Sequence, residues 1–142
     1  SSYISGVSSN FNGDTSNWRI FFTPIMAGLF NVLVNDDHFR VLDSSLHFRV
    51  TPGRMYPSAC VPSWKGLMNE FVAGTKAAVL ILPRDAFGNN VSSASEGSNT
   101  YNFTVFSSNA NGSIATLLNV TYMGWDEFGY LSIEFIAATA GN

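Results

Sequence analysis

Apolar and polar residues alternate over two stretches in the second half of the chain, residues 101–106 and 114–122. A period of two places successive side chains on opposite faces of a β-strand, so both stretches are predicted to be half-buried strands. The same alternation turns Asn102 and Asn119 outward. The apolar positions expected to face a core are Tyr101, Phe103, Val105, Ile114, Leu118, Val120 and Tyr122.

The first third of the chain predicts three further strands, at residues 18–22, 29–34 and 46–50. Asn35-Asp36-Asp37-His38 is rich in turn-forming residues and is expected to form a hairpin turn before the third strand. The positions expected to face inward on that third strand are Leu46, Phe48 and Val50.

No stretch of ten or more residues shows a convincing helical stripe. Residues 64–73 come closest, but Pro62, Gly66 and Gly74 confine any helix there to about one turn. Short strands separated by turn residues favour antiparallel pairing, in which two sheets bury their apolar faces against each other. The predicted fold class is therefore all-β, an antiparallel β-sandwich.

The strand pattern breaks once, at Thr51-Pro52-Gly53 and the following Met55-Tyr56-Pro57. Proline restricts the chain there, while Gly and an exposed stretch let two units meet with few contacts. We therefore predict a domain boundary that separates residues 1–53 from residues 54–142.

A repeat spans this boundary. Residues 20–28 read IFFTPIMAG and residues 133–141 read IEFIAATAG, and they agree at Ile, Phe, Ala and Gly with a constant offset of 113. Tandem copies of one module explain the agreement economically. Chance similarity between two β-strands is the alternative.

Composition limits the class of protein. The chain has 142 residues, 46% of them apolar and only 12% charged, so Ser, Thr and Asn must supply the surface polarity, which favours a secreted protein. A net charge of −3 without clustered Lys and Arg excludes nucleic acid and an anionic membrane surface as partners. The most apolar stretches contain Pro24 or are too short to insert into a membrane, which takes about 20 residues. Because the chain begins without Met and without a leader, we expect it to belong to a longer protein.

Four Asn-x-Ser/Thr sequons lie close together in the second half of the chain. Each is weak alone, but together they favour a glycosylated extracellular chain. A Ser/Asn-rich loop region with chance matches is the alternative. The candidate N-glycosylation residues are Asn90, Asn102, Asn111 and Asn119.

A tight turn is predicted within residues 79–93, VLILPRDAFGNNVSS. The Asp85 carboxylate is expected to accept hydrogen bonds from turn amides, and Gly88 and Asn89 tolerate positive φ. Arg84 is expected either to pair with a carboxylate or to cover apolar surface with its stem. All four residues are predicted to be structural, not catalytic.

Residues capable of catalysis or metal binding do not converge. His38 lies in an expected turn and His47 at an outward position, and neither lies near Cys60 in a recognisable pattern. Two His and one Cys also fall short of the four ligands of a closed zinc site. Asp36-Asp37 with Asp43 lacks the spacing of a calcium site, so a solvated turn is favoured. We expect no enzymatic activity, no metal and no cofactor.

Cys60 is the single cysteine, so it cannot form a disulfide within this chain and is expected to be a small buried apolar residue. A disulfide with a cysteine elsewhere in the parent protein is the alternative. Three aromatic residues are candidates for partner binding, because aromatic side chains dominate interface energetics. Ordinary core packing is the alternative for each of them. These residues are Tyr56, Trp64 and Trp125.

The chain resembles the filamin-type immunoglobulin-like repeat. That family opens with a Gly-Leu and an Ala-Gly, found here at Gly66-Leu67 and Ala73-Gly74, and its Arg-Asp-Ala-x-Gly-Asn turn stands letter for letter at residues 84–89. Its late strands are matched at residues 18–34 and again at residues 125–135.

The resemblance covers nearly the whole chain. Residues 1–53 resemble the last strands of one repeat, and residues 54–142 resemble most of the following repeat. One departure is that the Gly-Ser-Pro before the closing strand is Asp43-Ser44-Ser45 here. The resemblance implies an immunoglobulin-like β-sandwich.

A sequon-rich form of this repeat is similar to the filamin-repeat proteins that plants express on gamete surfaces, which attach gametes to one another. The similarity implies a non-enzymatic extracellular module, part of the ectodomain of a membrane-anchored parent, that binds a protein on an opposing cell surface. An intracellular scaffold linking actin or signalling partners is the alternative, and a carbohydrate-active enzyme comes third.

Sandwiches of this family bind peptides along one sheet edge, and the strand expected at residues 101–106 is the candidate edge. Two partial repeats would also leave apolar surface uncovered. We therefore expect the strands of residues 1–53 to complete the sheets of the next unit, within one chain or by exchange in a dimer, unless residues outside this chain do so.

Overall fold

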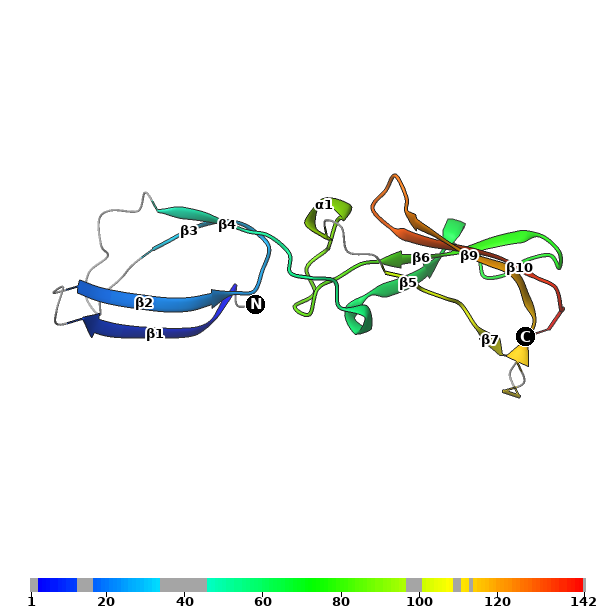
Figure 1. Ribbon diagram of the computed structural model, residues 1–142, viewed down its shortest axis with the longest axis horizontal. Helices are drawn as coiled ribbons and strands as arrows, with labels where there is room; N and C mark the ends of the chain where they lie inside the picture. The colour runs from blue at the N-terminus through cyan, green and yellow to red at the C-terminus, as the bar shows by residue number, and fades with distance from the viewer. Residues whose placement is uncertain are drawn as a thin grey trace. The chain divides into compact units, whose positions relative to one another are not determined.

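The computed structural model describes residues 3–12, 17–33, 46–96, 101–108, 111–112 and 114–141 (Figure 1). Strands dominate these residues, and every paired strand is antiparallel, which confirms the all-β prediction. The chain divides into two compact units, Ser1–Gly53 and Arg54–Asn142. Within the described residues, no helix has the length and apolar character needed to cross a membrane.

Unit 1 contains two antiparallel pairs of strands, β1 with β2 and β3 with β4. The Phe48 ring on β4 lies 5.7 Å from the Phe22 ring on β2 and 5.6 Å from the Phe30 ring on β3. An isolated pair of strands is marginally stable at best, so this aromatic cluster is what joins the two pairs. The strands are β1 (Ile4–Asn12), β2 (Asn17–Pro24), β3 (Gly28–Asn31) and β4 (His47–Val50).

Unit 2 is built on a four-stranded sheet with the order β5-β6-β10-β9, and a second short pair joins β7 to β8. Three helical segments of three or four residues lie between the strands. The elements are η1 (Pro57–Ala59), β5 (Val61–Trp64), η2 (Lys65–Leu67), β6 (Lys76–Leu82), α1 (Ser93–Glu96), β7 (Ser107–Ser108), β8 (Ile114–Ala115), β9 (Leu117–Trp125) and β10 (Leu131–Ala137).

The core of unit 2 lies against one face of this sheet. Leu131 and Ile133, in the central strand β10, are each 1% exposed. Because β10 is paired on both sides, its inward side chains are surrounded by neighbours, as expected for a central strand. The buried core cluster consists of Met55, Ile81, Val91, Leu131 and Ile133.

The β1–β2 pair and the β9–β10 pair share the same irregularity. In unit 1 the register shifts between Ser5 and Ser8, which leaves Gly6 and Val7 opposite a single residue of β2. In unit 2 it shifts between Leu118 and Thr121, 113 positions later in the chain. Two residues opposite one define a β-bulge. The two units therefore carry equivalent strand pairs, at the same offset as the repeat in the sequence.

Burial differs between the equivalent positions. Ile20 is 51% exposed, whereas Ile133 is 1% exposed, and Phe22 is 37% exposed, whereas Phe135 is 4% exposed. In unit 2, β10 has β6 as a second neighbour, and further residues pack over its inner face. Unit 1 has no counterpart of β6 beside β2 among the residues described, so its inner face is less covered.

The strand expected at residues 101–106 is not formed. Its side chains still alternate as predicted, since Tyr101, Phe103 and Val105 pack against the core and Asn102 and Thr104 are exposed. However, no strand among the described residues pairs with this segment, and of the described residues that follow it the two of β7 pair with β8. An alternating pattern indicates which side chains face a core. A β-strand also requires backbone hydrogen bonds to a neighbouring strand, which the pattern does not indicate. The sheet edges are therefore β5 and β9, and the predicted edge was wrong.

The bulge in β9 also corrects the predicted facing of two residues. Leu118 and Val120 were expected to face inward with Tyr122, but they are 45% and 38% exposed. Tyr122 pairs with the inward Ile133, whereas Leu118 pairs with a position on the opposite face. The extra bulge residue shifts the period of two by one, which moves Leu118 to the other face. Val120 is itself one of the two bulge residues, which together oppose a single residue of β10.

Predictions for the remaining segments were correct in part, since the strand expected at residues 29–34 is formed only at Gly28–Asn31. The helical tendency of residues 64–73 is limited to η2, where Gly66 has a φ of 78°. Phe48 and Val50 are half-buried as expected, but Leu46, just before β4, is 61% exposed. The predicted turn at residues 35–38 lies outside the described residues.

Candidate functional site

Asp85 organises the turn after β6. Its side chain is buried, and its Oδ1 accepts hydrogen bonds from the backbone N–H groups of Phe87 and Asn89, each at 2.9 Å. Gly88 has a φ of 85°, a conformation that favours glycine. Asn89, which tolerates positive φ, does not adopt it here. It instead donates its side-chain Nδ2 to Oδ2 of Asp85 at 2.9 Å.

The turn between β9 and β10 has the same construction. Oδ1 of Asp126 accepts hydrogen bonds from the backbone N–H groups of Phe128 at 2.9 Å and Tyr130 at 2.8 Å. Gly129 has a φ of 85°, the value found at Gly88. Sequence reasoning missed this equivalence. The signal was the spacing Asp-x-Phe-Gly, which occurs at residues 85–88 and again at residues 126–129.

Both turns lie at the same end of the unit 2 sheet. Leu131, the first residue of β10, pairs with Ile81 near the end of β6 and with Trp125 at the end of β9. The turns that follow β6 and β9 must therefore emerge at this end. Each presents a phenylalanine to solvent, since Phe87 is 63% exposed and Phe128 is 77% exposed.

Tyr56 lies at this end as well. Its backbone N–H donates to the carbonyl oxygen of Arg84 at 2.8 Å, and the preceding Met55 forms a β-bridge with Asp85. Met55 is buried in the core, whereas Tyr56 is 52% exposed. We call Tyr56, Phe87 and Phe128 the aromatic tips. Large, rigid aromatic side chains are the residues that most often dominate protein interfaces.

Hydrogen bonds of a buried carboxylate stabilise this end of unit 2. Glu96, the last residue of α1, is buried and accepts a hydrogen bond from the backbone N–H of Met55. Burial raises the pKa of the Tyr101 hydroxyl, and the hydrogen bond and negative charge of Glu96 raise it further, while Arg54 lowers it. The hydrogen bond from Met55 to Glu96 thus connects α1 to the segment that contains Tyr56.

Arg84 is half-buried in the predicted structural turn. Two roles were predicted for Arg84, an ion pair and the packing of its stem. It forms no ion pair with a carboxylate of the described residues. Its Nε is buried without a hydrogen-bond partner in the described part of the chain. The side chain therefore contributes mainly through the packing of its stem.

A hollow lies at the opposite end of unit 2, with a volume of 780 Å³. Trp64 lies on its wall, with its ring 5.1 Å from that of Phe71 and 6.3 Å from that of Phe135. Apolar and small uncharged side chains line the hollow, and no titratable group of the described residues takes part. The lining offers shape and apolar contact, not acid–base chemistry.

The other candidate residues are placed separately. Trp125 packs against the core, as expected of ordinary packing, whereas Trp64 is 37% exposed. Cys60 is half-buried, packs against the core and places its Sγ 3.5 Å from the carbonyl oxygen of Tyr56. His47 is exposed.

The described residues contain no cluster of three or more His, Cys, Asp or Glu side chains that could hold a metal ion. The three acidic residues considered for calcium lie outside the described residues, namely Asp36, Asp37 and Asp43. His38 lies outside them as well.

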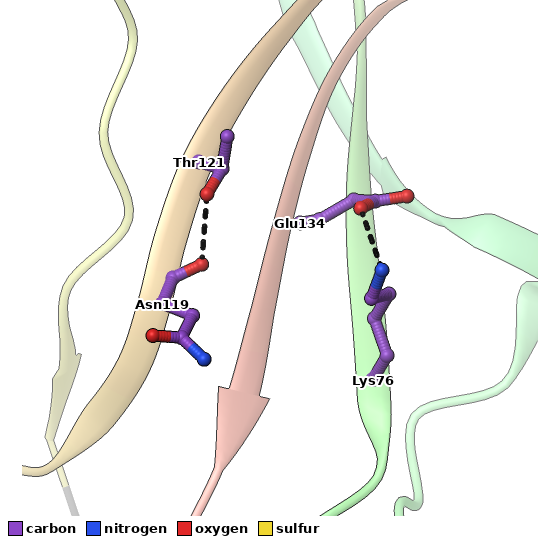
Figure 2. A network of polar contacts seen from close by, with 4 residues as sticks. All are labelled: Lys76, Asn119, Thr121 and Glu134. Carbon is purple, nitrogen blue, oxygen red and sulfur yellow. Dashed lines mark hydrogen bonds and ion pairs between the residues drawn. The ribbon is translucent and has the colours of Figure 1, made fainter.

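All four sequon asparagines are exposed, namely Asn90, Asn102, Asn111 and Asn119. Asn119 differs from the others because it lies within a paired strand, in the bulge of β9. Figure 2 shows it on β9, near the Lys76–Glu134 ion pair, in which Nζ and Oε2 are 3.3 Å apart. Attachment of sugar at the four residues stays a prediction.

Comparison with known proteins identifies the family. The sequence model described as the GEX2 N-terminal Ig-like domain matches residues 1–50 and 58–142. The chain belongs to this family. Protein GAMETE EXPRESSED 2 of Arabidopsis thaliana is 48% identical over 117 residues, which cover 82% of this chain and 13% of that relative. No solved structure matches the chain.

Membership in the GEX2 N-terminal Ig-like family confirms the immunoglobulin-like fold class and the resemblance to plant gamete-expressed proteins. The two matched segments are separated by residues 51–57, where the sequence pattern breaks. The chain spans about an eighth of the length of the relative, so the activity of the whole relative is not carried over to this chain.

Proposed function

We propose that this chain is a non-enzymatic adhesion module that acts outside the cell, in attachment between gametes, by binding a protein on the opposing cell surface. Family membership and the similarity to a gamete-expressed relative support this function. The single observation that carries it in the structure is the display of the aromatic tips at one end of unit 2.

The construction of the two turns favours binding by the aromatic tips. In each turn an aspartate carboxylate accepts hydrogen bonds from two backbone amides, one of them that of the exposed phenylalanine, so this residue projects from a fixed loop. A fixed loop loses little conformational entropy when a partner binds. Exposed Phe side chains lower the solubility of a protein, and exposed apolar groups commonly mark binding sites. A partner that covers these two side chains would explain why they are exposed.

The attachment test uses the purified chain on fluorescent beads, applied to intact gametes of both sexes and to somatic cells. We expect binding to one gamete type. The double variant Phe87→Ser/Phe128→Ser is expected to lower the affinity about tenfold or more, because central aromatic residues dominate binding energy. Phe106→Ser is the matched control, since Phe106 is 87% exposed but lines the hollow at the opposite end.

Equal binding of the double variant and the control would contradict the assignment of binding to the aromatic tips. Protease treatment of the gametes before the assay should abolish binding if the partner is a protein. Binding that survives protease but not glycosidase would instead identify a carbohydrate partner.

The extracellular location has its own test. Mass spectrometry of the native protein should find N-linked sugar on at least some of Asn90, Asn102, Asn111 and Asn119. Four unmodified residues would contradict this location and favour the intracellular scaffold.

A further inference from the structure

The two edges of the unit 2 sheet are protected to different degrees. β5 is four residues long and contains Pro62, which has no N–H to offer a partner strand. β9 is nine residues long and has no proline. An unpaired edge of this length is a template for pairing with another chain. β9 therefore needs a protection that β5 does not.

The exposed side chains of β9 add to this hazard. Leu118, Val120 and Met123 are 45%, 38% and 55% exposed. β-branched and apolar residues on an exposed edge favour strand addition and aggregation. In the described part of the sheet, no strand lies beyond β9 to cover them.

The bulge supplies part of the protection. Asn119 has a φ of 52°, which interrupts the regular edge, and its carbonyl oxygen accepts a hydrogen bond from the Thr121 hydroxyl at 3.1 Å (Figure 2). This backbone acceptor is thus engaged by a side chain of its own strand. A second register shift, at Met123, interrupts β9 again. Bulges disrupt the ladder only locally, so the residues between and beyond the two shifts still form an open edge.

The backbone conformation alone does not explain why Asn is found at this position. The equivalent residue in β1 is Gly6, which has a φ of 61° and forms the same bulge. Glycine meets the conformational requirement without cost. Asn119 also tolerates it, and together with Thr121 it adds a sequon. At the bulge position, the side-chain amide is therefore the feature that β9 has and β1 lacks.

We propose that Asn119 carries an N-linked glycan that covers the free edge of β9 and prevents this edge from pairing with other strands. The proposal rests on the extracellular location proposed above, because N-glycosylation takes place along the secretory route. Asn119 and Thr121 are both exposed, so the folded strand has room for the sugar.

The co-reactant is an oligosaccharide linked to a lipid pyrophosphate. Nδ2 of Asn119 forms a bond to the anomeric carbon of the sugar, and the bond from that carbon to the phosphate oxygen breaks. The lipid pyrophosphate leaves with the electron pair, and Nδ2 loses one proton. The glycan then stands at the bulge, at the third residue of β9, where its bulk prevents a second strand from approaching.

The first experiment measures occupancy. The chain is secreted from cultured plant or insect cells, and its glycans are removed enzymatically in ¹⁸O-water, which converts each occupied Asn into ¹⁸O-labelled Asp. We expect the label at residue 119 in the wild type and in Thr121→Ser, and its loss in Thr121→Ala and Asn119→Gly. A wild-type chain labelled at other sequons but not at residue 119 would overturn the proposal and leave the extracellular location intact.

The second experiment measures self-association of the same secreted proteins by light scattering over a range of concentrations. Asn119→Gly is the decisive variant, because it keeps the bulge conformation of Gly6 and removes the sugar. We expect it to form several-fold more dimer and larger species than the wild type. The control is Thr104→Ala, which removes the sequon of Asn102 outside the sheet and should leave association unchanged.

Circular dichroism and the thermal midpoint establish that each variant is folded. If folded Asn119→Gly protein stays as monomeric as the wild type, or if Thr104→Ala raises association equally, the glycan does not protect β9. Neither result would affect the attachment assay on the aromatic tips, so failure here is distinguishable from failure of the proposed function.

Discussion

At the scale of single residues, two aspartates determine the form of the surface at one end of unit 2. Asp85 and Asp126 each accept hydrogen bonds from two backbone N–H groups, at 2.8–2.9 Å. A charged acceptor makes stronger hydrogen bonds than a neutral one, and amides left without an acceptor are costly when buried. The two carboxylates thus hold the loops from which Phe87 and Phe128 project.

The first prediction compares these aspartates. Asp85→Ala is expected to lower the free energy of unfolding by about 2–3 kcal/mol, because Asp85 is buried and its loss leaves two amides without their acceptor. Asp126→Ala should cost less, about 1–2 kcal/mol, since its turn is more open to water. Urea unfolding followed by tryptophan fluorescence measures both, with Glu127→Ala as the exposed control. A larger loss for Asp126→Ala would contradict this account.

The second prediction concerns pH. Burial raises the pKa of Tyr122, and burial together with Glu96 raises that of Tyr101. A tyrosine whose pKa is raised by folding stabilises the fold fully below its unfolded pKa, about 10, and this contribution is lost as the pH rises through the folded pKa. Stability should therefore fall above about pH 10.

Tyrosinate absorbance during an alkaline titration tests this expectation. A late-titrating component should be present in the wild type and should shrink in Tyr101→Phe and again in Tyr122→Phe. If neither substitution alters the late part of the curve, the two hydroxyls are not shifted as described.

At the scale of elements, the bulge shared by β1 and β9 is the main determinant of how side chains are distributed. In both strands, two residues oppose one residue of the partner strand, and the first of the two has a positive φ. An extra residue reverses the facing of everything on one side of it. The facing of Leu118 therefore follows from its pairing, not from its place in the alternating pattern.

The third prediction tests this conformation in β1. Gly6→Val should lower the stability of unit 1 by about 1–2 kcal/mol, because a β-branched residue resists a φ of 61°. Apart from its chain neighbours, no described residue places a heavy atom within 4 Å of the added Cβ, so the cost comes from the backbone. Gly6→Asn should be nearly neutral, as Asn119 adopts the same conformation. Protein made in bacteria, which excludes glycosylation, is compared by amide hydrogen exchange in β1 and β2. Equal losses for Val and Asn would argue against backbone strain.

At the scale of the whole molecule, equivalent positions of the repeat have different surroundings. Ile20 and Ile133 stand 113 positions apart in equivalent strands, yet Ile20 is 51% exposed and Ile133 is 1% exposed. The difference arises because β10 is paired with β6 as well as β9, whereas β2 is paired with β1. Within the described residues of unit 1, no further strand pairs with β2.

The fourth prediction uses this pair. Ile133→Thr should destabilise unit 2 by about 2 kcal/mol or more, because it buries a hydroxyl in the core and leaves a void. Ile20→Thr should leave unfolding nearly unchanged and should reduce self-association of the unglycosylated chain. Urea unfolding and light scattering measure the two effects. Comparable destabilisation by both substitutions would show that the face bearing Ile20 is covered in solution.

The sequence by itself determined the β-class, most strands of unit 1, the outward position of the sequon asparagines and the Asp85 turn. These features depend on local chemistry, namely a period of two, turn-forming residues and a short carboxylate beside amides. Only the tertiary structure decided that residues 101–106 pair with no strand, that β9 is an edge, and that Phe87 and Phe128 emerge at one end of the sheet. Each of these features depends on which distant segment of the chain supplies the neighbouring hydrogen bonds and the covering side chains. A local sequence pattern does not indicate which segment that is.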